Sequence, residues 1–142
     1  MKKADHLHRA IAKAIDFLLV GIAAKLSWAG VLGGALYILI ADGFHGQSLG
    51  KRLIGLRVIV DDPPKTPHPA LFRESILRNA VFGLLVVLSS LGLILGTLFF
   101  VFLVVFVAAE TYFIYMDDRG IRIGDIFAGT RVIEEAKDEA EA

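Results

Sequence analysis

The sequence predicts an all-α integral membrane protein with four transmembrane helices arranged as two hairpins. Two observations favour this class. Of the 142 residues, 56% are hydrophobic, and a water-soluble protein of this size has too little interior to bury so much apolar surface. The apolar residues also gather in two blocks, residues 10–41 and 79–116, with no charged residue between Val81 and Ala109. Runs of this length are typical of membrane spans.

Each block is too long for one crossing perpendicular to the membrane. As single helices the blocks would measure roughly 48 and 57 Å, at about 1.5 Å per residue, against a hydrocarbon core about 30 Å thick. We therefore expect a turn inside each block. Residues 25–30 form the first candidate, since lysine and tryptophan favour the interface and glycine permits a reversal, and residues 89–92 form the second. The alternative is three crossings, with one block forming a single tilted helix.

Basic residues lie in three segments around the blocks, at the N-terminus, in the centre and at the C-terminus. The positive-inside tendency places all three on the cytoplasmic side of the cell (inner) membrane, so we expect both termini inside. Lys25 is the only basic residue left for the far side. The three segments carry Lys2, Lys3, Arg9 and Lys13; Lys51, Arg52, Arg57, Lys65, Arg73 and Arg78; and Arg119, Arg122, Arg131 and Lys137.

The composition also narrows the classes of function. The formal net charge is zero, so no global basic bias points to a nucleic-acid partner. The absence of cysteine excludes a disulfide framework, thiolate metal sites and a cysteine nucleophile. No nucleophile with a base, and no set of metal ligands, stands out along the chain. We therefore expect no enzymatic activity, no cofactor and no bound metal.

Each block is followed by a similar short segment, which suggests an internal repeat. Residues 49–59 and 123–133 align without gaps and share two glycines five positions apart and the ending Arg-Val-Ile. Each segment predicts a short helix or loop, a glycine turn and a strand, at Leu56–Val60 and at Thr130–Ile133. A pseudo-two-fold axis along the membrane normal relates such repeats, so we expect the strands to pair antiparallel beneath the bilayer. The predicted units are a first repeat at 1–62, a proline-rich connector at 63–69, a second repeat at 70–135 and a frayed acidic tail at 136–142.

Three motifs follow one another along the chain, at residues 9–19, 46–58 and 124–132. In this order they resemble the RDD family of small membrane proteins, which is named for one arginine and two aspartates. The resemblance implies that Arg9 is the family arginine and that Asp16 and Asp125 are its two aspartates. It also implies a function in transport of an unknown ligand, in sodium–proton exchange as in some members, or in a larger membrane assembly as in others.

Asp16 and Glu110 are the candidates for an ion or proton site. A carboxylate inside a membrane helix is costly and usually has a partner or a water-filled cavity. The candidate partners of Asp16 are Arg9, two turns earlier on the same helix face, and Arg73 or Arg78 from the second half. One interpretation is a titrating carboxylate, and the other is a structural ion pair that locks the first helix. Glu110 either faces Asp16, so that the pair shares a proton or small cation, or hydrogen-bonds to a neighbouring helix.

The segment after the first block carries a basic pair, Lys51 and Arg52, close to the inner membrane surface. It is not a phosphate-binding loop, because His45 and Arg52 stand where that motif has glycine and serine or threonine. Contact with anionic lipid headgroups, at about 1 kcal/mol each, explains the pair as well as any ligand does. Asp125 either caps a helix or pairs with the basic loop, and its alignment with Lys51 suggests an ion pair between the two halves. The complete cytoplasmic motif and lipid-contact set is Gln47, Ser48, Gly50, Lys51, Arg52, Gly55, Arg57, Gly129, Thr130 and Arg131.

Two functions agree with these features. A carrier or ion-coupled exchanger would place Asp16 and Glu110 in a cavity. Since four short helices leave little room for a pathway, it would work as a homodimer or larger assembly. A non-catalytic scaffold or accessory subunit would hold a partner protein or anionic lipid through the basic central loop, with Asp16 as a buried lock. Small residues such as Gly92 and Gly96 permit close helix packing in either case.

Overall fold

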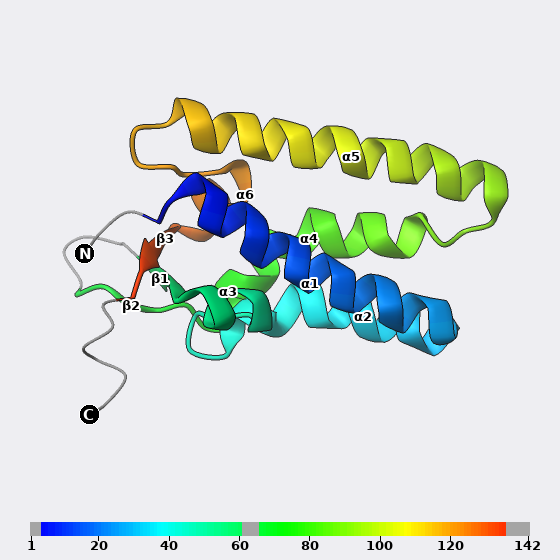
Figure 1. The fold of residues 1–142 in the computed structure, drawn as a ribbon, viewed down its shortest axis with the longest axis horizontal. Coiled ribbons are helices and arrows are strands. Elements are labelled where there is room, and N and C mark those ends of the chain that lie inside the picture. Colours follow the sequence, from blue (N-terminus) through cyan, green and yellow to red (C-terminus); the bar gives the residue numbers. More distant parts are fainter. Residues whose placement is uncertain (1–3, 61–65, 136–142) are drawn as a thin grey trace.

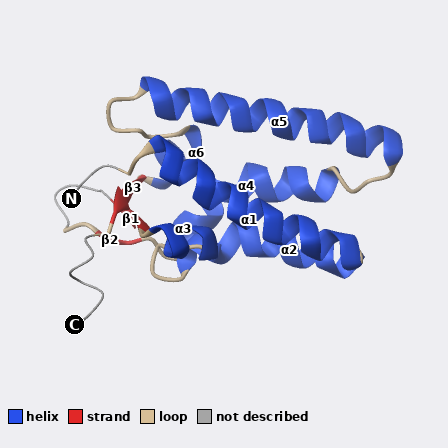
Figure 2. Cartoon of the chain, in the orientation of Figure 1, coloured by secondary structure: helices blue, strands red, loops and turns tan. Residues whose placement is uncertain are grey.

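Each apolar block folds into two helices joined by a tight turn (Figures 1 and 2). The computed structural model describes residues 4–60 and 66–135. The helix breaks fall at Ser27 and at residues 89–92, where the sequence predicts the two turns. The long helices are α1 (His6–Leu26), α2 (Trp28–Ile40), α4 (Phe72–Leu88) and α5 (Leu93–Met116).

Helices α1 and α4 begin several residues before the apolar blocks do. Arg73 and Arg78, which the charge pattern assigns to the central loop, therefore lie within α4, and that assignment is wrong. The reason is that the first turns of α4 bury a polar face. Ser75, Arg78 and Asn79 follow the three- and four-residue spacing of one helix face, and all three are buried. These polar residues therefore belong to a helix and face the interior of the protein, rather than to a solvent-exposed loop.

Helix α5 has the length and composition of a membrane span. Within the described residues it is the one helix that is both long and apolar enough to cross a bilayer, with 24 residues or about 36 Å. Only 11% of its most apolar window is buried, whereas a core helix of a soluble protein is mostly buried. Helix α2 is also apolar, but its 13 residues extend only about 20 Å.

After each hairpin the chain forms a short helix, a glycine turn and a strand, a unit that we call a hook. The glycine turns are left-handed, with a φ of +80° at Gly55 and +62° at Gly129, a conformation that glycine adopts without steric cost. A 3-10 turn, η1 (Ala41–Gly43), ends the first hairpin. The first hook is α3 (Leu49–Ile54) with β1 (Leu56–Val60), and the second is α6 (Ile123–Ala128) with β3 (Thr130–Glu134).

The two hooks join through a small sheet. Strands β1 and β3 pair antiparallel with Val58 opposite Val132, so the predicted pairing is confirmed. A third strand, β2 (His68–Pro69), pairs with the other edge of β1 and gives the order β2-β1-β3. The sequence does not predict β2, because two residues in a proline-rich connector carry no periodic signal. The sheet corrects the all-α class to a mostly helical one, and residues 61–65 and the tail at 136–142 lie outside the described residues.

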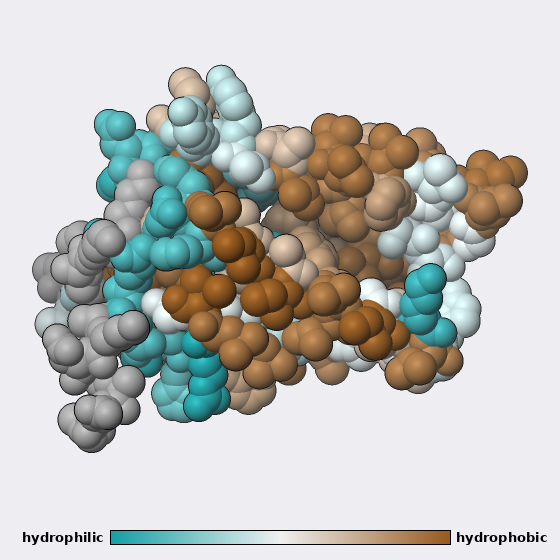
Figure 3. Space-filling model, viewed as in Figure 1, coloured by the Kyte–Doolittle hydropathy of each residue, from teal (hydrophilic) through white to brown (hydrophobic). Residues whose placement is uncertain are grey.

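The sheet and hooks occupy one end of the helical bundle (Figure 1). The N-terminal segment reaches the same end, because the Ala4 N–H donates to the Val132 carbonyl at 3.4 Å. Figure 3 shows polar surface gathered at this end and apolar surface along most of the rest of the bundle. One apolar cluster lies at the sheet around Leu56 and Val58, and a second lies between the helices around Phe82. The charged residues described below lie between these two clusters.

Candidate functional site

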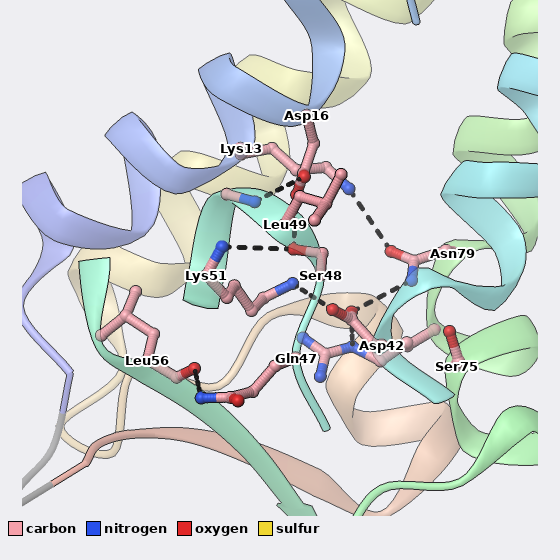
Figure 4. Close-up of polar contacts among 12 residues, drawn as sticks. Lys13, Asp16, Asp42, Gln47, Ser48, Leu49, Lys51, Leu56, Ser75 and Asn79 are labelled. Carbon is pink, nitrogen blue, oxygen red and sulfur yellow. Dashed lines mark hydrogen bonds and ion pairs between the residues drawn. The ribbon is translucent and has the colours of Figure 1, made fainter. Parts of the chain in front are cut away.

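The polar end of the bundle holds a buried group of acidic and basic side chains, which we call the ion cluster; Figure 4 shows part of it. Its members come from α1, α4 and α5, from η1 and from both hooks. Buried charges of this kind are stable only when they are paired or hydrogen-bonded. The ion cluster consists of the carboxylates Asp16, Asp42, Glu110 and Asp125 and the cations Arg9, Lys13, Lys51, Arg78 and Arg122.

Asp16 is buried on α1 and accepts three hydrogen bonds. Its Oδ2 atom accepts from the Ser48 hydroxyl at 2.6 Å. Its Oδ1 atom accepts from the Tyr37 hydroxyl at 2.7 Å and from the Gly50 backbone N–H at 2.9 Å. Ser48 is the N-cap of α3, and the first N–H groups of a helix have no partner within it. Asp16 therefore fastens the first turn of α3 to α1.

Asp42 forms a second centre at the end of the first hairpin. Its Oδ1 atom accepts from the Lys51 ammonium at 2.5 Å. Its Oδ2 atom accepts from the Asn79 amide at 3.2 Å and lies 3.7 Å from Nε of Arg78. Asp42 and Lys51 are both less than a tenth exposed, so the pair is shielded from water. Asp42 joins the first hook to α4.

Asp125 forms a third centre, where three arginines converge. Arg78 lies 2.8 Å from Oδ1, Arg9 lies 3.1 Å from Oδ2, and Arg122 lies 3.4 Å from Oδ1. The Thr130 hydroxyl donates to Oδ1 at 3.3 Å. Since Arg9 belongs to α1 and Arg78 to α4, Asp125 ties the second hook to both hairpins.

Glu110 on α5 does for the second hook what Asp16 does for the first. Its Oε1 atom accepts from the Gly124 backbone N–H at 3.2 Å, and its Oε2 atom lies 3.6 Å from Nε of Arg122. Gly124 and Gly50 occupy aligned positions of the two hooks. Both carboxylates therefore accept a hydrogen bond from the first turn of a short helix, where the helix dipole favours a negative charge.

The charges around the hooks shift one another's pKa values. Burial alone would raise the pKa of Asp125, but Arg78, Arg122 and Arg9 outweigh it and lower that pKa to about 2. Burial would likewise raise the pKa of Asp42, which Lys51 and Arg78 instead hold well below its usual range. Burial lowers the pKa of Lys51, although Asp42 opposes the shift. Both aspartates are therefore ionised throughout the physiological range of pH.

Two cavities of very different size adjoin the ion cluster. A cavity of 300 Å³ lies between α1 and α5 and is bordered by Lys13, Glu110 and Arg122, among others. Asp16 does not border it. Asp16 and Asp42 border a separate void of only 10 Å³, which is about the lower limit for one water molecule. Asp16 therefore has room for one water molecule at most, whereas Glu110 borders the larger cavity.

The structure changes the expected partners of Asp16 and Glu110. In the described part of the chain no arginine forms an ion pair with Asp16, so the expectation of an arginine partner is wrong. Arg9 and Arg78 bind Asp125 instead, because the second hook reaches back between the hairpins. Glu110 does not meet Asp16, and its hydrogen bond to Gly124 agrees with the alternative, a glutamate bonded to a neighbouring helix.

The expected role of Lys51 is also wrong in two respects. Lys51 pairs with Asp42 and not with Asp125, because Asp42 lies directly beside the first hook. Its side chain is 9% exposed, so its charge does not lie on the outer surface that meets the headgroups of the surrounding bilayer. Arg52, the next residue, is exposed and keeps that role as a prediction.

The remaining motif residues lie on or beside the hooks. The Gln47 amide donates to the Leu56 carbonyl at 3.0 Å and so braces the first strand. Arg57 forms an ion pair with Glu135 across the sheet. Arg131 is half-buried on β3.

Sequence reasoning missed four members of this site. The sequence places Asn79 at the start of the second apolar block and Arg122 in the basic C-terminal segment, and it gives no role to Asp42 or Tyr37. The signal was available for Asp42 and Asn79, since each is a polar residue adjoining a long apolar run, where a buried polar contact is expected. Arg122 and Tyr37 carry no such local signal.

The fold and the ion cluster define a mostly helical membrane protein in which buried charges hold two hooks against one end of a bundle. A family model, described as the RDD family, matches residues 4–129, and the chain belongs to this family. The match confirms the resemblance that the three motifs suggest, and it contains Arg9, Asp16 and Asp125. Comparisons with curated proteins and with solved structures each found no match.

Proposed function

We propose that this chain is a non-catalytic membrane scaffold or accessory subunit, which presents its two hooks to a partner protein or to anionic lipid. The environment of Asp16 carries the proposal. Its carboxylate has three hydrogen-bond donors, is 3% exposed and borders a void of only 10 Å³. A carboxylate that moves ions needs a water-filled path. The geometry of Asp16 therefore supports a structural lock over an ion site.

The short helices of the hooks support contact with the membrane surface. On α6, Ile126 is 65% exposed and Phe127 is 75% exposed, and on α3, Leu53 is 74% exposed. Arg52 lies beside Leu53 and is also exposed. Apolar side chains next to an exposed cation are the composition that favours binding at the interface of an anionic bilayer.

Cation or proton exchange is the second candidate, and Glu110 is the observation that favours it. Glu110 borders the 300 Å³ cavity. Its Oε2 atom has no hydrogen-bond partner among the described residues. Under this alternative Glu110, and not Asp16, is the titrating group.

Flux measurements in reconstituted vesicles separate the two candidates. The wild-type chain, Asp16→Asn and Glu110→Gln are reconstituted, and sodium and proton fluxes are followed after a gradient is imposed. We expect no flux above that of empty vesicles, and a lower thermal unfolding midpoint for Asp16→Asn in detergent. Wild-type flux that either variant abolishes without a change in unfolding midpoint would establish the exchanger instead.

We also propose that both hairpins cross the cell (inner) membrane and that both termini and the hooks face the cytoplasm. The gathering of the hooks and the N-terminal segment at one end of the bundle supports this, together with the basic residues there. Because the chain lacks cysteine, single cysteines at Ala29, Leu91 and Arg52 report the topology. An impermeant thiol reagent added to intact cells should label the first two and not the third. Labelling of Arg52→Cys alone would reverse the orientation.

The two halves are, we propose, copies of one unit. Val58 and Val132 occupy aligned positions and stand opposite each other between β1 and β3, as a two-fold axis through that point requires. Helix α3 packs on α1 and helix α6 packs on α4, so each short helix contacts the first helix of its own hairpin. Co-expression of residues 1–62 and 63–142 as separate chains tests the idea. Recovery of a stable complex is the expected result.

A further inference from the structure

A groove runs along the bundle between α1 and α5. Helix α5 packs against α4, and Figure 3 shows a hollow between α5 and α1. The groove has an outer compartment of 660 Å³ and the inner cavity of 300 Å³ described above. Phe17 and Val107 border both compartments, so the two adjoin each other. The inner end is bounded by the rings of His6 and Tyr115, whose centroids are 6.0 Å apart.

The outer compartment is apolar and open along its side. Val20, Val86 and Leu103 form part of its wall. Gly21 also borders it, and no atom lies within 4 Å of the position where a Cβ on Gly21 would be. From Lys13 to Lys25 the groove extends about 18 Å along α1, which is close to the depth of one leaflet of a bilayer with an apolar core of about 30 Å.

The inner compartment is basic. Arg9, Lys13, Lys51, Arg78 and Arg122 border it, against the single carboxylate of Glu110. Lys13 differs from the other four, because in the described part of the chain no carboxylate lies within ion-pair distance of its ammonium. The ammonium donates to the Asn79 amide oxygen at 3.4 Å and lies 4.5 Å from the centroid of the Phe82 ring. It is the cation that remains available for an anion from outside the chain.

A helix from a second copy of the chain fits the groove less well than a lipid does, because it has no acidic side chain to place beside Lys13. The residues of α2 and the stretch from Val81 to Ala109 carry no charge. The bundle carboxylates Asp16 and Glu110 are buried, so a neighbouring copy offers no acidic side chain at this depth. An apolar chain that ends in an anionic group matches both compartments, and a bilayer supplies such molecules.

We propose that the groove between α1 and α5 binds one anionic phospholipid, with an acyl chain in the outer compartment and the phosphate beside Lys13. Such a lipid would fill the gap that α5 leaves beside α1 and would complete the charge balance of the ion cluster. The site lies within the bundle and is separate from the exposed surface of the hooks. It goes beyond the scaffold function and stands or falls independently of it.

Native mass spectrometry of the full chain in a non-ionic detergent tests the site. The protein is titrated with phosphatidylglycerol or with phosphatidylcholine, and the population carrying one bound lipid is measured. Lys13→Met removes the free cation and keeps an apolar stem, and Gly21→Leu fills the outer compartment. The matched controls are Arg73→Met, which removes an exposed cation of α4 outside the groove, and Gly33→Leu, since Gly33 is exposed on α2 with nothing within 4 Å of its Cβ position.

We expect phosphatidylglycerol to bind at least fivefold more tightly than phosphatidylcholine. Lys13→Met and Gly21→Leu should each reduce its binding at least fivefold, whereas both controls should leave it unchanged. The proposal would be overturned if the two lipids bound equally well. It would also be overturned if the control variants lost binding as much as Lys13→Met and Gly21→Leu do. A dimer that Gly21→Leu converts to monomer would overturn it as well, since a second copy would then be the occupant. If Lys13→Met does not fold, Gly21→Leu against Gly33→Leu decides the question alone.

Discussion

Asp16 lies three turns into α1, at a depth where an ionised carboxylate needs strong compensation. Two hydroxyl groups and one backbone N–H provide it at distances of 2.6 to 2.9 Å, and hydrogen bonds to a charged acceptor are stronger than those between neutral groups. Tyr37 also accepts from the Leu49 N–H at 3.1 Å. The hydroxyl groups of Tyr37 and Ser48 therefore link the Asp16 carboxylate to the start of α3. The negative charge of Asp16 holds α3 against α1.

Removal of the Asp42 carboxylate should destabilise the chain more than removal of its partner. In Asp42→Asn the Lys51 ammonium stays buried without its closest anion, 2.5 Å away in the wild type, and loss of one member of a buried pair costs about 3–5 kcal/mol. In Lys51→Met, Asp42 keeps Asn79 and Arg78. The double variant Asp42→Asn/Lys51→Met should recover a large part of the loss.

Thermal unfolding midpoints in a non-ionic detergent, measured for the two single variants and the double variant, check this prediction. The double-mutant cycle isolates the energy of coupling between the two positions. Additive effects in the double variant would contradict the buried pair.

At the scale of the element, each hook depends on the close approach of two backbones. A Cβ on Gly50 would overlap the Ala12 carbonyl oxygen, and a Cβ on Gly124 would overlap that of Arg78. Backbone atoms cannot rotate away as a side chain can. The short helices thereby come near enough to α1 and α4 for the Gly50 and Gly124 N–H groups to reach Asp16 and Glu110.

Alanine at these two glycines should destabilise the chain, contrary to the usual effect of glycine to alanine in a helix. Overpacking of this kind costs about 1–3 kcal/mol, whereas alanine normally gains roughly 0.5–1 kcal/mol in a helix interior. Gly33→Ala is the control, because nothing lies within 4 Å of its Cβ position. In thermal unfolding, Gly50→Ala and Gly124→Ala should each have a lower midpoint than the wild type. Gly33→Ala should have an equal or higher one. Midpoints that do not distinguish the three variants would show that the hooks do not dock closely.

The elements that the sequence predicts correctly are those with a local signal. The turns at Ser27 and at residues 89–92 interrupt apolar runs, and β1 and β3 follow repeated glycines and β-branched residues. The charge pattern misplaces the start of α4, because a buried arginine such as Arg78 has the same sequence signal as a loop cation. Within the ion cluster the pair of Arg9 and Asp125 joins residues 116 positions apart. No spacing in the sequence encodes that contact.

At the scale of the whole molecule, the ion cluster adds charged links between halves that already pack together, since α2 lies against α4 and β1 pairs with β3. Arg78 lies between Asp42 and Asp125, which belong to different halves of the chain. Arg122 lies between Asp125 and Glu110, so α5 is joined to the second hook. Each of these cations bridges two carboxylates, and the loss of one carboxylate's charge weakens two connections. The hairpins and hooks are therefore expected to unfold together.

Acid should unfold the chain through these carboxylates. The pKa of Asp125 is lowered from 3.8 to about 2 in the folded chain, and that of Asp42 is lowered as well. A carboxylate with a lowered pKa adds stability that is fully present above its unfolded pKa and is lost as the pH falls through the folded one. Asp125 should therefore contribute about 2 kcal/mol at neutral pH, and this contribution should disappear between about pH 4 and pH 2.

Unfolding midpoints in a non-ionic detergent should be level from pH 7 to pH 5 and fall steeply below pH 4. Asp118→Asn, at an exposed acid, should keep the same profile, and a level midpoint down to pH 2 would mean that the arginines around Asp125 do not stabilise the fold.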